Sequence, residues 1–107
     1  MNTRQHTPSR VRIGETLHLI AAWTRESTRD LAPYVGATDD RPGGVDHTTV
    51  SRLLRQGPGN LDHVDDLCRH WGITLTELLA GFGWLEEKGR LPRAVRDAKA
   101  TGQQLLA

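Results

Sequence analysis

The chain has 107 residues, 14 basic and 13 acidic side chains, and a formal net charge of +1. This length suits one domain with a modest core, and so small a net charge gives no reason by itself to expect a polyanionic partner. One cysteine excludes an intramolecular disulfide, and neither a signal-peptide pattern nor an apolar run of roughly 20 residues is present, so we expect a protein of the reducing cytoplasm with no membrane segment.

The N-terminal residues 1–9 are predicted to form a flexible basic arm. A first helix is predicted near residues 10–25, because apolar side chains recur there with the helical period. One face carries Ile13, Leu17, Ile20 and Thr24, and Leu19 and Trp23 widen it toward a second contact surface.

Ser27 and Asp30 have the spacing of a capping box, which predicts a second helix ending near Gly36. Pro33 interrupts this helix, so it must either start late or bend. Residues 37–44, ATDDRPGG, are rich in turn formers and predict a loop. We expect this loop to be mobile rather than bound to a partner.

A third helix is predicted from Asp46, its N-cap, to Gly57, which ends it. One side of this helix is apolar, and the other is polar and carries Thr48, Ser51, Arg52 and Arg55. Asn60 caps a fourth helix, whose apolar stripe comprises Leu61, Val64, Leu67, Cys68 and Trp71. Thr74 and Glu77 form a second capping box that opens a fifth helix.

Glycines interrupt the sequence after Ala80, and Pro92 is well placed to begin a last helix. That helix would carry a thin stripe of Val95, Ala98, Gly102 and Leu105. The chain therefore predicts an all-α fold of five to six helices. Its parts would be an arm (1–9), a helical domain (10–80) and a C-terminal extension (81–107) used for packing or dimerisation.

Three segments together resemble the Cro and lambda-repressor type of helix-turn-helix regulator. They are LAPYVG from Leu31, VDHTTVSRLLRQG from Val45 and NLDHVDDLCRHWGITLTELL from Asn60. The resemblance implies a compact DNA-binding domain in which the third helix reads bases. It assigns base contacts to Asp46, His47, Thr48, Ser51, Arg52 and Arg55. Two departures are Pro33 and about eight extra residues in the turn between the second and third helices, so the angle between those helices cannot be assumed.

Side-chain chemistry agrees with this assignment. Arginine donates twice to guanine, serine and threonine use either hydrogen-bond role, and the threonine methyl suits thymine. Backbone amides near Thr28, Arg29 and Asn60, at the starts of two helices, are candidates to hold phosphates. In the N-terminal region Arg4 and Arg10 are candidates for a minor groove, and an arm without contacts is an equal alternative.

Three other features have alternative interpretations. His63, Cys68 and His70 invite a metal site, but Cys68 lies on an apolar stripe and is better explained as a buried thiol, so no metal or other cofactor is expected. Phe82, Trp84 and Leu85 form either core or an exposed dimerisation patch. The ending QQLLA is a weak candidate for a degradation signal.

The sequence thus predicts a sequence-specific repressor of phage or prophage type, bound to a double-stranded DNA operator in a bacterial host, with a homodimer as a candidate state. No small-molecule ligand is indicated. The alternative is a helical interaction module, such as an antitoxin or adaptor, that binds a partner through Trp84 and Phe82. An enzyme is not expected, because no phosphate loop, metal-ligand set or activated nucleophile is recognisable.

Overall fold

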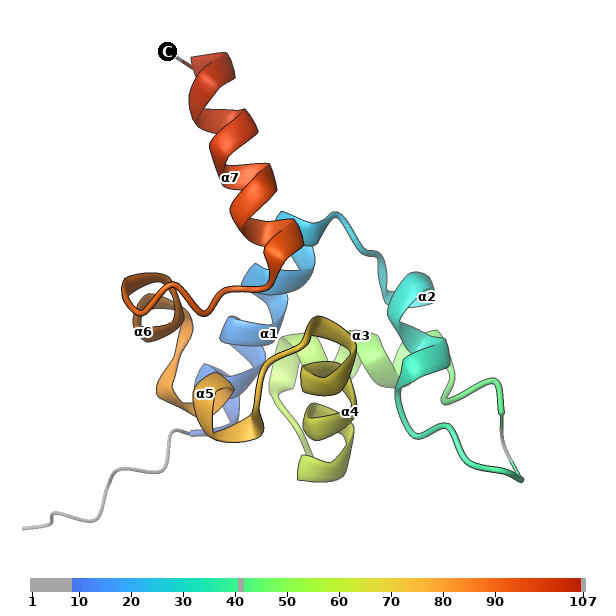
Figure 1. Cartoon of the computed structure of the whole chain (residues 1–107). Coiled ribbons are helices and arrows are strands. Elements are labelled where there is room, and N and C mark those ends of the chain that lie inside the picture. Colours follow the sequence, from blue (N-terminus) through green and yellow to red (C-terminus); the bar gives the residue numbers. More distant parts are fainter. Residues whose placement is uncertain (1–8, 41, 107) are drawn as a thin grey trace, which may run out of the picture.

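The computed structural model describes residues 9–40 and 42–106, with side chains to residue 101, and this part of the chain contains helices and no strand (Figure 1). The helices are α1 (Arg10–Thr24), α2 (Thr28–Leu31), α3 (His47–Gln56), α4 (Leu61–Trp71), α5 (Leu75–Ala80), α6 (Phe82–Glu87) and α7 (Arg93–Leu106). The all-α prediction is confirmed. The described residues form seven α-helices, one more than the five to six predicted, because the glycine-containing segment after Gly81 forms α6.

Helix starts follow the predicted caps. Ser27 and Thr74 each complete a capping box with the acidic residue three positions later. The side chains of Asp46 and Asn60 accept hydrogen bonds from backbone amides two residues on. These contacts are local, which is why the sequence alone predicts them.

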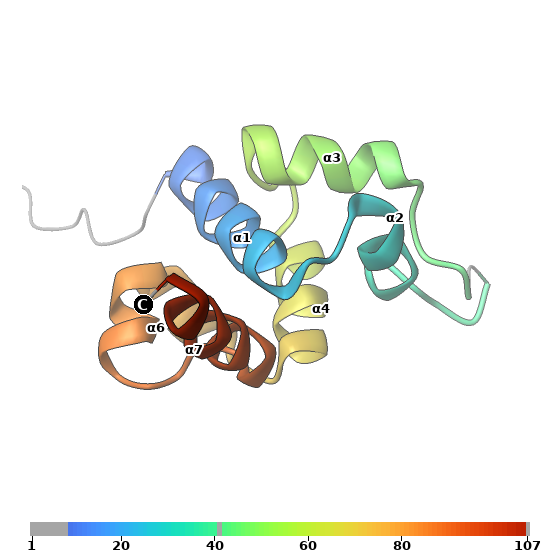
Figure 2. The same cartoon turned by 90° about the horizontal axis from the view of Figure 1, so that it is seen from above.

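The core lies around α1, which separates α3 from α6 and α7 (Figure 2). Leu17 and Ile20 on α1 are fully buried, as predicted. The fourth-helix stripe is confirmed for Val64, Leu67, Cys68 and Trp71, but Leu61 is 47% exposed. The prediction was wrong for Leu61 because it is the first residue of α4, beyond the reach of the elements that cover the rest of the stripe.

α1 and α3 approach closely through two glycines. A methyl group on Gly14 would lie 3.0–3.1 Å from backbone atoms of Gly57 and Leu53. Gly14 interrupts an otherwise favourable helical sequence, and its place in mid-helix is explained by this contact with the end of α3. The crossing fixes the position of α3 against the core.

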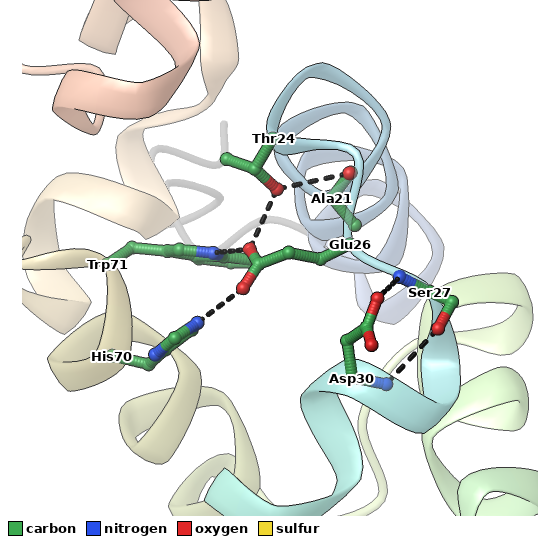
Figure 3. A network of polar contacts seen from close by, with 7 residues as sticks. All are labelled: Ala21, Thr24, Glu26, Ser27, Asp30, His70 and Trp71. Atoms are coloured by element: carbon green, nitrogen blue, oxygen red, sulfur yellow. Dashed lines mark hydrogen bonds and ion pairs between the residues drawn. The ribbon is translucent and has the colours of Figure 1, made fainter.

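The link between α1 and α2 is attached to α4 by Glu26 (Figure 3). Its Oε1 accepts hydrogen bonds from Thr24 Oγ1 at 2.7 Å and Trp71 Nε1 at 2.8 Å, and His70 Nε2 lies 2.5 Å from its Oε2. Burial raises the pKa of Glu26, but these hydrogen bonds outweigh it and leave the pKa below its ordinary value. The Tyr34 ring stacks on His70 with centroids 3.9 Å apart. The cluster joins four segments around one carboxylate.

Candidate nucleic-acid interface

α3 lies at one edge of the molecule (Figure 2), and its polar side is the more exposed one. Val50, Leu53 and Leu54 are buried behind it and hold the helix on the core. Thr48, Arg52 and Arg55 are exposed, and His47 and Ser51 are half-buried. α3 therefore has the two sides that the sequence predicted.

The two arginines of α3 have no ionic partner in the described part of the chain. Neither forms an ion pair, whereas Arg69 and Arg90 are each bound to a carboxylate at 2.5–2.6 Å. Arg52 and Arg55 lie one turn apart, so both guanidinium groups extend from the same side of α3. This surface has positive charge available for an external anion.

Asp46 is engaged with Thr48 at the start of α3. Its carboxylate accepts from the Thr48 hydroxyl at 2.9 Å and from the Thr48 amide at 3.5 Å. The hydroxyl bond is the largest of the contacts that lower the pKa of Asp46. The Thr48 oxygen keeps acceptor capacity, and its methyl group remains available for contact. Asp46 thus has a structural role beside the predicted base contact.

The loop inserted between α2 and α3 is closed at its base. Val45 N donates to Val35 O at 2.9 Å, and Gly36 N donates to Asp66 Oδ2 on α4 at 2.7 Å. Gly44 packs so tightly that a methyl group on it would lie 2.1 Å from Ala32 O. The described residues of this loop, 37–40 and 42–43, are exposed and project away from the helices (Figure 1). α2 and α3 therefore remain in contact despite the insertion.

Pro33 is accommodated by a change of helix type: the helix does not start late, since α2 begins at Thr28. α2 ends at Leu31, and one turn of 3-10 helix, Ala32–Tyr34, continues it. Because proline has no amide to donate to Arg29 O, the hydrogen-bond ladder of α2 cannot continue past Ala32, and the proline lies in the first positions of the 3-10 turn instead.

Arg10 is not part of an arm. It is the first residue of α1, and its Nε donates to Pro58 O at 2.7 Å, in the link between α3 and α4. The assignment of Arg10 to a free minor-groove arm is therefore wrong, because this hydrogen bond holds the side chain against the domain. Arg4 lies outside the described residues.

A hollow of about 210 Å³ brings together residues that the sequence assigned to separate roles. Arg10, Arg52 and Asn60 line it, together with the half-buried His63. His63 was not predicted at this surface, although its place one turn after the Asn60 cap was a usable signal in the sequence. At the other predicted phosphate position, Thr28 is half-buried and Arg29 is exposed.

The predicted dimer patch is divided by the fold. Leu85 is 0% exposed and packs into the core, so of the two alternatives left open for it the core one holds and the exposed patch does not. Phe82 is half-buried beneath the ammonium group of Lys99, which also lies over the Trp23 ring. Trp84 is 36% exposed and lines a cavity of about 460 Å³ between α1 and the α5–α6 segment.

The remaining predicted features are located as follows. Cys68 is buried, as expected, and no cluster of metal-ligating side chains occurs within the described residues. α7 follows Pro92 and buries Val95, while its later part extends away from the other helices (Figure 1). The burial of Gly102, of Leu105 and of the rest of the QQLLA ending lies outside what the structure describes.

Comparison with known proteins finds no matching family model, no matching curated protein and no matching solved structure. Among the described residues, no helix combines the length and apolar character needed to cross a bilayer. The function must therefore be argued from the geometry of α3 and from the resemblance in the sequence.

Proposed function

We propose that the protein binds double-stranded DNA sequence-specifically and represses transcription by occupying an operator, as a phage or prophage repressor of the Cro and lambda-repressor type does. The observation that carries this proposal is α3: an edge helix anchored from behind by apolar side chains, with Arg52 and Arg55 exposed and free of ion pairs with other described residues. A helix of this width fits the major groove of B-form DNA.

The chemistry of the exposed side supports base reading. Arg52 and Arg55 can each donate two hydrogen bonds to guanine, and Thr48 offers a methyl group and an acceptor oxygen. Ser51 is the remaining polar contact, one turn from both Thr48 and Arg55. Asp46 and His47 lie at the helix start, where they would meet the edge of the site.

The hollow beside α3 supports a phosphate contact. Arg10 and Arg52 lie on its lining with Asn60, whose side chain caps the 11-residue helix α4. A phosphate there would meet the guanidinium group of Arg10 and the positive end of a helix dipole, which leaves Arg52 for the bases. This contact would position α3 without reading sequence.

The first step of the test is to select bound fragments from a random duplex pool with the full chain, which yields a motif. Binding is then titrated for Arg52→Ala, Arg55→Ala and Arg96→Ala, the last on α7, which lies across α1 from α3 (Figure 2). We expect each α3 variant to lose about 1–3 kcal/mol on the selected site and much less on unrelated duplex. Arg96→Ala should match the wild type.

Arg4→Ala provides a further comparison. As a residue of the predicted basic arm, it should weaken binding to all sequences equally and flatten the salt dependence. Equal losses on every duplex for the α3 variants as well would refute base reading. No binding to any duplex at moderate salt would favour the interaction-module alternative, in which the exposed Trp84 contacts a protein partner.

A further inference from the structure

The outward face of α1 carries a stripe that no described element covers. Its members are Val11, Glu15, His18 and Ala22, which are all exposed and are spaced by four, three and four residues. This spacing places them in one row along a helix. Val11 is 54% exposed, and Leu19, which flanks the row, is 42% exposed. Glu15 and His18 have no ion pair with any described residue.

We propose that this stripe is a self-association surface, on which α1 packs antiparallel against α1 of a second copy of the chain. A two-fold axis between positions 15 and 18 sets Glu15 opposite His18 of the other copy and Val11 opposite Ala22. Because the interface is two-fold, each contact occurs twice. The imidazole donates to the carboxylate whether or not it carries the extra proton.

The charge pattern selects both the partner and the direction. In a parallel pairing, Glu15 would meet Glu15 and His18 would meet His18, which places like groups together. Only the antiparallel arrangement sets each acid against an imidazole, so the stripe is complementary to itself. A second copy of the chain therefore suffices to satisfy both groups.

The surface beside the stripe can receive apolar atoms. A shallow hollow of about 470 Å³ lies there, lined by Glu15, His18, Leu19 and Leu54. Leu54 belongs to the buried side of α3, so the hollow bridges α1 and the end of that helix. A 15-residue helix is only about 22 Å long, so the interface is small and the dimer weak, in the micromolar range.

The test is sedimentation equilibrium of the full chain without DNA, over about three decades of concentration around the micromolar range. The variants are Glu15→Lys, His18→Glu and the two changes combined. His18→Glu replaces two attractive contacts by two pairs of like charges, and Glu15→Lys removes the carboxylate that accepts from each imidazole. We therefore expect each single change to weaken dimerisation by about tenfold or more. The combined variant restores opposite partners and should return to within about threefold of the wild type.

Glu87→Lys on α6 is the matched control, because it makes the same charge change at an exposed site away from the stripe and should leave dimerisation unchanged. A chain that stays monomeric throughout, or a combined variant as weak as the single ones, would overturn the proposal. So would a dimer that Trp84→Ala abolishes while both single charge variants keep it. Since no DNA is present, the outcome is independent of the proposed function.

Discussion

Gly57 ends α3 in a conformation that other residues adopt only under strain, with φ 88° and ψ 173°. A methyl group there would lie 1.9 Å from the carbonyl oxygen of Arg10 and 2.4 Å from its carbonyl carbon. Both are backbone atoms of α1, so no side-chain rotation can relieve the clash. We predict that Gly57→Ala lowers the free energy of unfolding by about 2–6 kcal/mol. This is the sum of roughly 1–3 kcal/mol for backbone strain and roughly 1–3 kcal/mol for displacing the packed atoms of α1.

The measurement is urea denaturation followed by far-UV circular dichroism, with a thermal scan in which the midpoint should fall by at least about 8 °C. Gly59→Ala is the matched control in the same link. A methyl group there would meet only the flexible Nη2 of Arg10, at 3.8 Å, and Gly59 has no positive φ. Its effect should stay within about 0.5 kcal/mol. Equal stability of the two variants would refute the inference that the close contact with α1 fixes the end of α3.

Three further outcomes are expected. Arg25 has φ 60° at the end of α1, a left-handed conformation that glycine adopts without strain. Arg25→Gly should therefore raise the free energy of unfolding by about 0.5–1 kcal/mol in the same assay, and a lower free energy of unfolding would contradict this. Hydrogen bonds from Arg90 and then from the Thr74 amide lower the pKa of Glu77 to about 2. The ionised Glu77 therefore stabilises the fold above the ordinary glutamate pKa, and this stabilisation is lost as pH falls toward 2. Glu77→Gln should remove this contribution to the loss of stability in acid, measured by urea denaturation at several pH values. Burial, and then the nearby carboxylates, raise the pKa of the Cys68 thiol to about 12. Ellman's reagent at pH 8 should therefore label Cys68 only after the chain unfolds. Rapid labelling of the native chain would contradict the burial of this thiol.

Local signals were enough to predict most helix starts. Asp46, Asn60 and the two capping boxes each act within three residues, so the sequence contains the whole interaction. The division of α3 into an apolar and a polar side was likewise predictable, because the helical period alone determines it. The polar side could therefore be named residue by residue, whereas its assignment to base contacts came from the resemblance.

Long-range contacts were not predictable in this way. Gly14 is an unfavourable residue in mid-helix until its contact with Gly57, 43 positions later, is known. Glu26 and Trp71 give no sequence signal of their hydrogen bond, and Arg10 was expected in an arm because its acceptor, Pro58, is 48 residues away. Such pairs depend on how the helices pack, which the period of a single helix does not specify.

The extra residues between α2 and α3 illustrate the same limit and bear on the proposed function. From the sequence, an insertion of about eight residues removes any basis for assuming how these helices lie. Two tertiary hydrogen bonds determine how the helices lie. Val45 N donates to Val35 O and draws the ends of the loop together, and Gly36 N, just before the loop, donates to Asp66 Oδ2 and attaches the chain to α4. Because chain entropy grows only slowly with loop length, so long a loop costs little once its base is closed. The packing of α2 against α3 then depends on the two hydrogen bonds that close the loop and not on how many residues the loop contains. The insertion therefore does not count against base reading by α3.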